Sequence, residues 1–468
     1  MSLLQHFTDE AQARAAAGDL DGAIALYRRA REAAPQSVAA EHNLGVALAA
    51  RHEYDEAAKH LRAALAKGGR DPATWLALAR TLQGAGRLDE AHAAFQDTLT
   101  RAPFDSVVHA EFAQLVWMRT GSPEAARARV LEALERRPND PALWRVLGWV
   151  LQYCGDWGRS VDAIAEAANA APDDPTHLTA LAFACLQTKA RDAGEAALDA
   201  AEAACVRAPR DFTSWVARSQ ALLALGRSGE ALADAERAVR LAPINQLALA
   251  TLALATRAAG DPRFADLCDL DALVRVETIA TPPGWATLDA YLADLAAAAR
   301  RAHKFETHPF GNSVRHGSQA PNILASRDPA LAAFPAAIDP AIRAHIETLR
   351  GRKDRPPGDR AVSGYAIQGA WSVKLKAGGF HSNHVHPEGW ISSVCYLALP
   401  DLTAEPAPAG WLTFGEPNFA TSPPQPRLGA VEPRPGRLVL FPSYFWHGTA
   451  PFAGAGERLT IAFDLIPA

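Results

Sequence analysis

A repeat of about 34 residues runs through the first 260 residues of the chain and constrains its fold more than any other feature. Prolines close successive segments at intervals of 68, 35, 34, 37 and 34 residues, at Pro35, Pro103, Pro138, Pro172, Pro209 and Pro243. The first interval equals two periods, and Asp71-Pro72 lies near the missing boundary. A fixed period of this length is typical of arrays in which each unit packs only on its neighbours.

Within a unit, a glycine turn separates two alanine-rich segments, as in Gly84-Ala-Gly86-Arg-Leu-Asp-Glu90-Ala91 and Leu225-Gly226-Arg-Ser-Gly-Glu230-Ala231. Small alanines let paired helices approach closely, while Leu and Trp at helical spacing bury against the next unit. The pattern resembles the tetratricopeptide repeat. We therefore expect about seven helix pairs, with a partial one from Asn245 to about Leu270.

Stacking such pairs gives a concave wall, which is the usual place for an extended peptide or protein segment. Asn43, Trp144 and Trp215 lie on the first helices of their units and are candidates to line this wall. The alternative role for each is packing between helices.

The hydrophobic pattern changes to period two at Trp371, where Trp371, Val373 and Leu375 alternate with polar residues. Further strands are expected at residues 391–399, 411–414, 437–441 and 458–465, with turn-rich segments between them. Many short strands with such turns predict a closed or sandwich β domain. Between the repeats and these strands, residues 288–303 predict a helix, and the polar, glycine-containing run 308–319 predicts a loop.

The β region contains a cluster of histidines. His384 and His386 are two positions apart, so on a strand their side chains leave the same face, about 7 Å apart. With His447 they could form one triangular face of a metal site and leave the opposite positions open, as in non-haem iron oxygenases. A zinc site is the competing interpretation, because imidazoles also suit catalytic zinc. The third possibility is a structural role.

Arg458 begins a segment in which apolar residues occupy positions 459, 461, 463 and 465, so Arg458 and Thr460 share the other face of that strand. A guanidinium beside a hydroxyl can hold a carboxylate through charge-assisted hydrogen bonds, and could anchor the far end of a dicarboxylate such as 2-oxoglutarate. The alternative for Arg458 alone is an ion pair at a strand end.

These segments are similar to the 2-oxoglutarate and iron(II)-dependent oxygenase superfamily, specifically to bacterial oxygenases fused to tetratricopeptide repeats. The matching stretches are Gly369-Ala-Trp371-Ser-Val, Gly379-Phe380-His381-Ser-Asn-His384-Val-His386-Pro-Glu-Gly389-Trp390 and Phe441-Pro-Ser-Tyr444-Phe-Trp446-His447-Gly-Thr449. The resemblance implies a double-stranded β-helix, or jelly roll. The chain is thus expected to be a multidomain α + β protein, with a repeat solenoid over residues 1–270, a mostly helical bridge over 271–360 and an oxygenase core over 361–468.

The resemblance also implies roles for individual residues. His384, His386 and His447 would hold iron, and Arg458 with Thr460 would hold the distal carboxylate of 2-oxoglutarate. Ser313, Arg315 and Gln319 match a run that precedes the barrel in the resembling proteins and would reach the active site, with an ordinary surface loop as the alternative. Tyr396 and Asn383 are candidate neighbours of the site, with packing and turn formation as their alternatives.

One departure concerns the first ligand strand. The common superfamily pattern is His-X-Asp or His-X-Glu followed by a distant His, whereas the position two after His384 is His386. His386-Pro-Glu388 would satisfy the acidic pattern and displace His384 from the metal. We favour His384 with His386, because subfamily members resemble this chain more at the His-X-His-Pro run than at the Glu position.

Composition narrows the possible partners. A net charge of −5 provides no excess of positive charge for binding nucleic acid. Five cysteines without CxxC spacing argue against a disulfide framework and fit a reducing cytoplasm. No segment approaches about 18 uninterrupted apolar residues, and the N-terminus lacks a signal-peptide pattern, so we expect no membrane association.

These patterns predict an iron(II)- and 2-oxoglutarate-dependent dioxygenase that hydroxylates a protein or peptide presented by the repeats. Two alternatives stay open. One is a non-catalytic repeat scaffold with a degenerate oxygenase domain, for which the His-X-His departure is the best support. The other is a small-molecule oxygenase whose repeats mediate assembly only.

Overall fold

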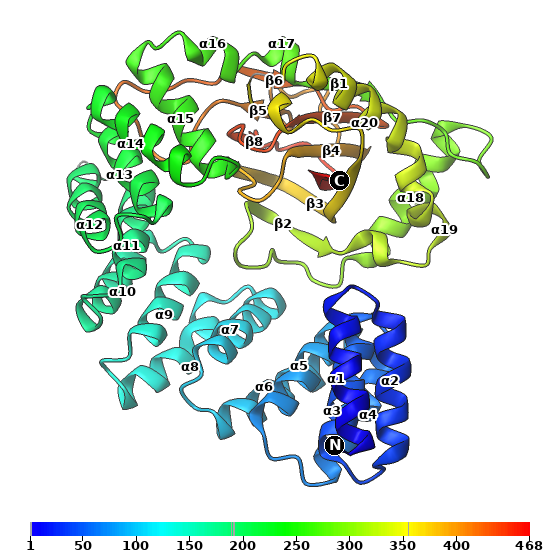
Figure 1. Cartoon of the computed structure of the whole chain (residues 1–468). Coiled ribbons are helices and arrows are strands. Elements are labelled where there is room, and N and C mark those ends of the chain that lie inside the picture. Colours follow the sequence, from blue (N-terminus) through cyan, green and yellow to red (C-terminus); the bar gives the residue numbers. More distant parts are fainter. Residues whose placement is uncertain (1, 189, 191, 354) are drawn as a thin grey trace. The chain divides into compact units, whose positions relative to one another are not determined.

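The computed structural model of the chain describes residues 2–188, 190, 192–353 and 355–468. Its contacts divide the chain into two compact units, with the boundary between Pro138 and Asn139. Figure 1 labels most of the helices and strands along the chain. No described helix combines the length and the hydropathy that crossing a bilayer requires.

The first unit consists of helices that pair with their neighbours in sequence. Its N-caps follow the usual chemistry, since the side chains of Ser37, Asp71 and Asp105 each accept a hydrogen bond from the first turn of the helix that follows. The helices are α1 (Leu3–Ala16), α2 (Leu20–Ala33), α3 (Val38–Ala50), α4 (Tyr54–Ala66), α5 (Pro72–Ala85), α6 (Leu88–Arg101), α7 (Ser106–Thr120) and α8 (Pro123–Arg136).

The second unit begins with the same kind of helix pair. Gly148 on α9 faces α10 so closely that a Cβ there would come 2.5 Å from Cγ1 of Ile164, which explains a glycine in the middle of this helix. The repeat helices are α9 (Pro141–Tyr153), α10 (Trp157–Ala170), α11 (Pro175–Thr188), α12 (Ala193–Arg207), α13 (Phe212–Ala224), α14 (Ser228–Leu241) and α15 (Gln246–Ala259).

Shorter and less regular helices lie between the repeat helices and the β region, and the one predicted for residues 288–303 is confirmed as α18. They are α16 (Arg263–Leu267), α17 (Leu270–Leu273), α18 (Leu288–Ala302), α19 (Pro329–Ala332) and α20 (Phe334–Arg350), with 3-10 turns at Ile323–Ala325 and Gly358–Arg360.

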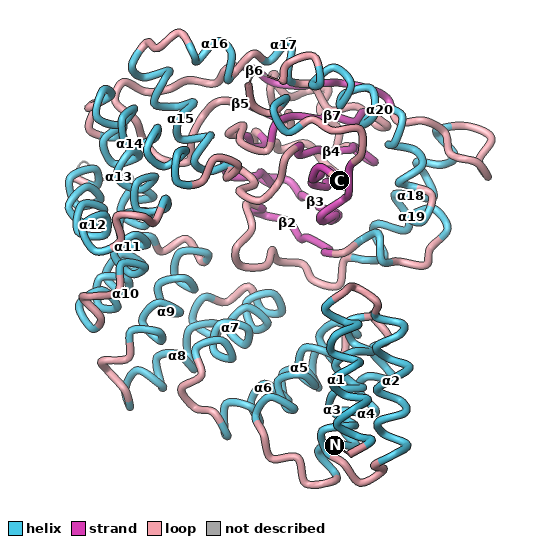
Figure 2. Tube along the Cα trace, in the orientation of Figure 1, coloured by secondary structure: helices cyan, strands magenta, loops and turns pink. Residues whose placement is uncertain are grey.

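The described strands form one antiparallel sheet in the order β1-β7-β4-β9-β3-β8-β5-β6, with β2 paired to β3. The sheet curls as in a jelly roll, which confirms the predicted fold class, and Figure 2 shows its strands gathered beside α18 to α20. The strands are β1 (Arg275–Thr278), β2 (Val314–Pro321), β3 (Tyr365–His384), β4 (Ile391–Ala398), β5 (Leu412–Phe414), β6 (Gly429–Val431), β7 (Arg437–Pro442), β8 (His447–Thr449) and β9 (Arg458–Pro467).

The strands predicted from period-two patterns are present, but the loop predicted over residues 308–319 is wrong from Val314 onward. There β2 pairs with β3, from Val314 opposite His381 to Pro321 opposite Trp371. Glycine at position 317 lies against the backbone of Lys374, so the residue that signals a loop here serves a close approach between strands. The segment between the repeats and the core thus contributes β1 and β2 to the sheet.

Candidate functional site

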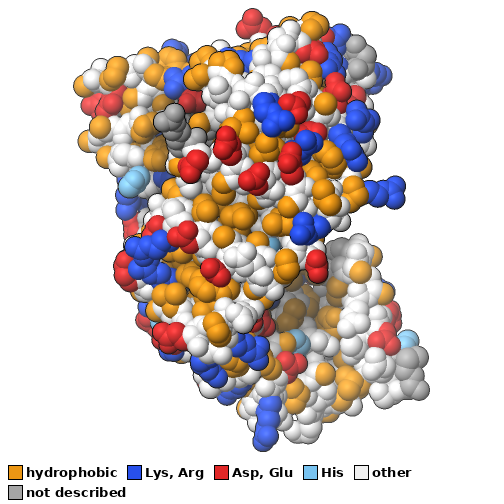
Figure 3. Space-filling model, turned by 90° about the vertical axis from the view of Figure 1, so that its left-hand side faces the viewer, with side chains coloured by type: hydrophobic (Ala, Val, Ile, Leu, Met, Phe, Trp, Pro, Cys, Tyr) orange, Lys and Arg blue, Asp and Glu red, His pale blue; other side chains and the backbone are white. Residues whose placement is uncertain are grey.

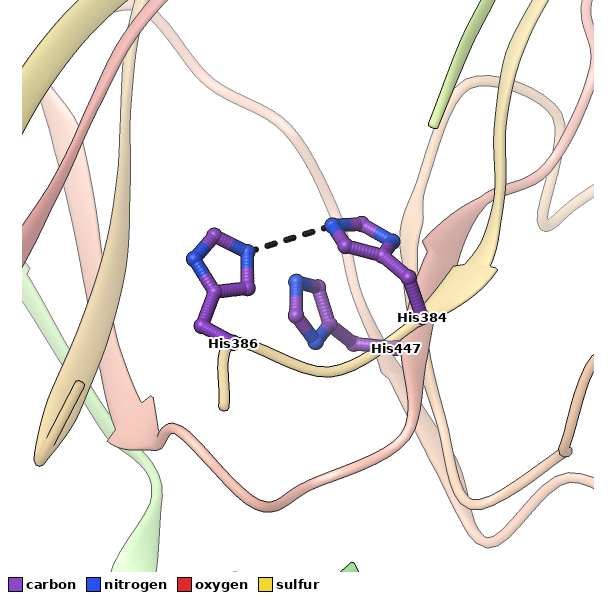
Figure 4. A group of neighbouring side chains, drawn as sticks. All are labelled: His384, His386 and His447. Carbon is purple, nitrogen blue, oxygen red and sulfur yellow. Dashed lines mark hydrogen bonds between the residues drawn. The ribbon is translucent and has the colours of Figure 1, made fainter. Parts of the chain in front are cut away.

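The three histidines favoured as metal ligands come together where β3 meets β8. His384 ends β3 and lies opposite His447, the first residue of β8. The prediction that His386 shares a strand with His384 is wrong, because β3 ends at His384 and the chain turns after it. The ring centroids of His384 and His447 are 4.2 Å apart, and His386 lies 5.1 Å from each. One ring nitrogen from each of the three lies within 4.8 Å of the others, and Figure 4 shows the rings turned toward one another.

Each of these imidazoles has its Nδ1 bound to an oxygen. The carbonyl of Ser382 faces Nδ1 of His384 at 2.9 Å, and the carbonyl of Phe445 faces Nδ1 of His447 at 2.8 Å. A carbonyl oxygen only accepts, so both Nδ1 atoms carry the proton and both Nε2 atoms keep a lone pair. Nδ1 of His386 is held in the same way by a carboxylate oxygen of Asp464, at 2.6 Å.

The Nε2 atoms of His384 and His386 are 3.2 Å apart. With both Nδ1 protons committed to oxygens, two lone pairs would face each other at this distance unless a cation lies between them. Burial, and then the neighbouring His386, lowers the pKa of His384 to about 3, which disfavours a proton as that cation. Burial, followed by His384, lowers the pKa of His447 well below its usual range. The donor set therefore suits a metal ion that accepts three neutral imidazoles.

Asp464 is a candidate site residue that the sequence reasoning missed, because it contacts the imidazole of His386. Its second oxygen accepts a hydrogen bond from Oγ of Ser392 at 2.7 Å, and Ser392 contacts Oγ of Ser443 at 2.9 Å. A carboxylate that orients a ligating imidazole is a recurrent device at metal sites. The signal was available, because position 464 shares the strand parity of Arg458 and Thr460.

His381 and Ser313 adjoin the same cluster. The hydroxyl of Ser313 lies 2.9 Å from Nδ1 of His381 and 3.2 Å from Nε2 of His384, and the two rings are stacked with centroids 6.0 Å apart. Ser313 therefore lies beside the site, as the resemblance implied. Gln319 lines the same cavity as the three histidines, whereas Arg315 lines a neighbouring one.

Glu388, the alternative acidic ligand, is exposed and lines the cavity. Among the described residues it does not belong to the group of converging ligand atoms, which comprises only the three histidines. The geometry therefore brings together the favoured set and leaves Glu388 at its edge.

Arg458 and Thr460 are both buried on β9, each 1% exposed, and both line a cavity of about 410 Å³ together with the three histidines. Nε of Arg458 donates to the carbonyl of Gly410 at 3.1 Å, and its guanidinium lies 4.9 Å from the centre of the Tyr396 ring. Within the part of the chain that the structure describes, no carboxylate forms an ion pair with Arg458. The alternative role for Arg458, an ion pair at a strand end, thus has no partner there. Burial lowers the pKa of Arg458, and Tyr396 opposes this effect.

A buried guanidinium without an internal counter-charge is costly, because the charge has lost its hydration. An anion entering the cavity would supply the missing partner. The cavity therefore combines a candidate metal centre with a candidate carboxylate anchor.

Comparison with known proteins supports both regions separately. The model of the family described as "Putative 2OG-Fe(II) oxygenase" matches residues 369–464. Tetratricopeptide repeat models match residues 14–73, 48–115, 115–175 and 212–245. No curated protein matches the sequence.

Several solved structures resemble the chain, and those named here are described as tetratricopeptide repeat proteins. The C-terminal part of one from Cytophaga hutchinsonii has 14% identity and a TM-score of 0.37, covering 52% of this chain and 99% of that one. One from Parabacteroides merdae has 15% identity and a TM-score of 0.36, covering 55% and 100%. A thermophilic one from Thermus thermophilus has 20% identity and a TM-score of 0.30, covering 39% and 99%.

The helix pairs agree with the tetratricopeptide repeat models, and the curled antiparallel sheet agrees with the oxygenase family model. The chain carries tetratricopeptide repeats in its N-terminal part and, at its C-terminal end, a domain of the family described as putative 2OG-Fe(II) oxygenases.

Proposed function

We propose that the protein is an iron(II)- and 2-oxoglutarate-dependent dioxygenase that hydroxylates a protein or peptide presented by its repeats. The observation that carries the proposal is the pairing, in one cavity of about 410 Å³, of three converging imidazoles with the buried, carboxylate-free guanidinium of Arg458. A zinc hydrolase would have no evident use for that guanidinium. A 2-oxoglutarate enzyme needs one to hold the far carboxylate.

In this proposal His384, His386 and His447 hold the iron through their Nε2 atoms, and Arg458 with Thr460 holds the distal carboxylate of 2-oxoglutarate. Bound iron(II) would allow 2-oxoglutarate and dioxygen to convert a substrate C–H to C–OH, with succinate and carbon dioxide as the other products. The chain's own contribution is to fix the ligand tautomers and to orient the dicarboxylate on the buried side chains of Arg458 and Thr460.

In this proposal each of the three regions of the chain has its own role. Residues 1–270 would present the substrate, 271–360 would connect the repeats to the core and complete its sheet, and 361–468 would carry the chemistry. We place the protein in the cytoplasm, consistent with five free cysteines.

Succinate release from 2-oxoglutarate tests the activity. The purified chain would be loaded anaerobically with iron(II), exposed to air and compared with His447→Ala and Arg458→Ala. A matched control is His316→Asn, because His316 is exposed and its φ of 52° is one that asparagine tolerates. We expect turnover in the wild type and control and its loss in both site variants. Equal succinate release from all four proteins would refute the assignment of the site.

One observation favours a second candidate, a repeat scaffold whose oxygenase domain has lost activity. No carboxylate belongs to the converging ligand group of the described residues, whereas the common superfamily pattern includes one. The scaffold predicts that neither iron(II) nor 2-oxoglutarate binds. Calorimetric titration with iron(II) and with 2-oxoglutarate therefore distinguishes an inactive domain from an enzyme that turns over only when its substrate is bound.

A further inference from the structure

A second and larger cavity, of about 830 Å³, adjoins the cavity that holds the histidines. The two share wall residues, among them Ser313, His381 and His384. All of its lining residues belong to the unit that begins at Asn139. We call this second cavity the groove. Anything bound in it lies directly beside the candidate metal ligands.

Repeat helices form one wall of the groove and the β region forms the other. Helices α9 to α11 contribute Trp149, Tyr153 and Phe183, among others, while β3 contributes Phe380 and Asn383. The two walls are held together locally, because the ring of Phe310 packs on Trp149 with centroids 5.0 Å apart and on Tyr153 at 5.8 Å. Packing between its two walls therefore fixes the groove within this unit.

The polar groups of the groove suit a polypeptide backbone. Amide side chains recur along its lining, from both walls: Gln152, Gln187, Gln220, Asn312, Asn383 and Asn418. A side-chain amide can both donate and accept hydrogen bonds, as can each peptide unit of an extended chain. Aromatic faces between them offer apolar area for side chains.

The charged groups of the groove are unbalanced. Three arginines line it, Arg145, Arg315 and Arg427, against a single acidic residue, the exposed Glu416. Elsewhere in this unit arginines are commonly paired, as Arg218 is with Asp234 and Arg263 with Glu236. Figure 3 likewise shows acidic and basic side chains interspersed over the outer face it presents.

Arg145 and Arg315 are half-buried, and neither forms an ion pair with any described residue. Nη1 of Arg145 donates to the carbonyl of Thr176 at 3.0 Å, and Nη1 of Arg315 donates to the carbonyls of Asn312 and Val314, both at 2.8 Å. The carboxylate of Asp174 attracts the guanidinium of Arg145 electrostatically, but it lies beyond ion-pair distance. Burial lowers the pKa of both guanidinium groups. These contacts fix the two side chains while leaving donors for a carboxylate.

We propose that the groove binds an acidic, extended segment of a substrate protein, with carboxylates of that segment on Arg145 and Arg315 and a neighbouring residue reaching the cavity of His384. This inference rests on the proposed function for what happens to that residue, but binding itself needs neither iron nor 2-oxoglutarate. The surrounding amides hold the backbone and the two guanidinium groups select the sequence.

A random pool of 12-residue peptides displayed on phage tests the selection. The pool would be panned, without metal, on three full-length proteins. These are the wild type, the double variant Arg145→Gln with Arg315→Gln, and the control variant Arg240→Gln. Arg240 is exposed on α14 and does not line the groove. We expect Asp and Glu to be enriched in peptides recovered by the wild type and the control, and no such enrichment with the double variant. No recovered peptides, or the same enrichment with the double variant, would overturn the proposal.

The recovered peptides would then be measured one by one by fluorescence anisotropy, each against a copy with Asp and Glu replaced by Asn and Gln. Binding to the wild type should weaken about tenfold for the neutral copy and for each single arginine variant, and should weaken as salt is raised. Equal affinity for both copies would refute the acidic preference without relying on any variant to fold. Acidic peptides that bind but support no succinate release would leave the groove intact and count against the oxygenase assignment instead.

Discussion

The carboxylate of Asp464 holds the imidazole of His386, with Oδ2 and Nδ1 2.6 Å apart. The two residues are 78 positions apart, and the register of β9 beside β3 and β4 brings them together. This contact sets which nitrogen of His386 points into the cavity. It gives the candidate metal centre a feature that can be tested without knowing the substrate.

Replacing Asp464 by Asn should weaken metal binding about 10- to 100-fold, because a neutral amide holds the Nδ1–H group of His386 less strongly than a carboxylate does. Cobalt(II) can stand in for iron, and its visible absorption reports on the ligands. Asp401→Asn, at an exposed turn, provides the control. Unchanged cobalt affinity in Asp464→Asn would remove Asp464 from the metal centre.

The second prediction concerns the shape of the Arg458 anchor. In Arg458→Lys the charge remains but the planar fork is lost, so the KM for 2-oxoglutarate should rise on the order of tenfold, the loss of one charged hydrogen bond. Metal affinity should stay the same, because Arg458 is not among the converging ligands. Steady-state kinetics and cobalt titration together check this. A parallel loss of metal affinity would point to collapse of the cavity instead.

The third prediction concerns the contact between α9 and residues 308–313. Phe310 is 4% exposed and packs on Trp149 and Tyr153, so Phe310→Ala should cost about 3 to 5 kcal/mol of unfolding free energy. Hydrogen exchange should also accelerate in residues 308–313, which carry Ser313. Phe112→Ala is the matched control, since Phe112 is also 4% exposed but packs on Phe95 in the first unit, and should leave exchange at 308–313 unaltered.

The fourth prediction concerns acid stability. His303 lies between the hydroxyls of Ser318 and Ser372, at 2.8 and 3.0 Å, and burial, followed by Lys374, lowers its pKa to about 4. The unfolded chain, with a histidine pKa near about 6.5, binds this proton more readily than the folded one. The stability that results from the neutral His303 is complete above about pH 6.5. It is lost as the pH falls, and the loss reaches roughly 3 kcal/mol near about pH 4.

Thermal unfolding midpoints measured from pH 7 to pH 4 check this dependence. In His303→Gln the midpoint should fall less steeply with acid than in the wild type. Arg240→Gln removes an exposed charge but no histidine, and should keep the wild-type slope. The same slope in His303→Gln would show that other groups, such as the buried His345 with its pKa lowered to about 4, carry the effect.

One candidate for the concave wall, Trp215, serves packing. Trp215 is 8% exposed, and its Nε1 donates to the carbonyl of Pro209, which closes the preceding unit. Neither Trp144 nor Trp215 lines the groove, whereas Trp149 does. A 34-residue period tells which helix faces its neighbours, but helices of one array are too alike in composition to show which of them faces a distant β region.

The repeat helices and the main strands followed from the sequence alone, because periods of 34, 3.6 and 2 residues are local properties of the chain. The family resemblance pointed to His384, His386 and His447 together, whereas their i, i+2 spacing on one strand did not hold, since β3 ends at His384. The tertiary structure decided the rest. β2 forms only because β3 supplies its hydrogen-bond partners, and Asp464 reaches His386 only through strand register. Arg145 and Arg315 line one groove because Phe310, which precedes β2, packs on Trp149 and Tyr153 of α9. Such contacts join residues distant in sequence, and their energy depends on burial and geometry that no local pattern contains.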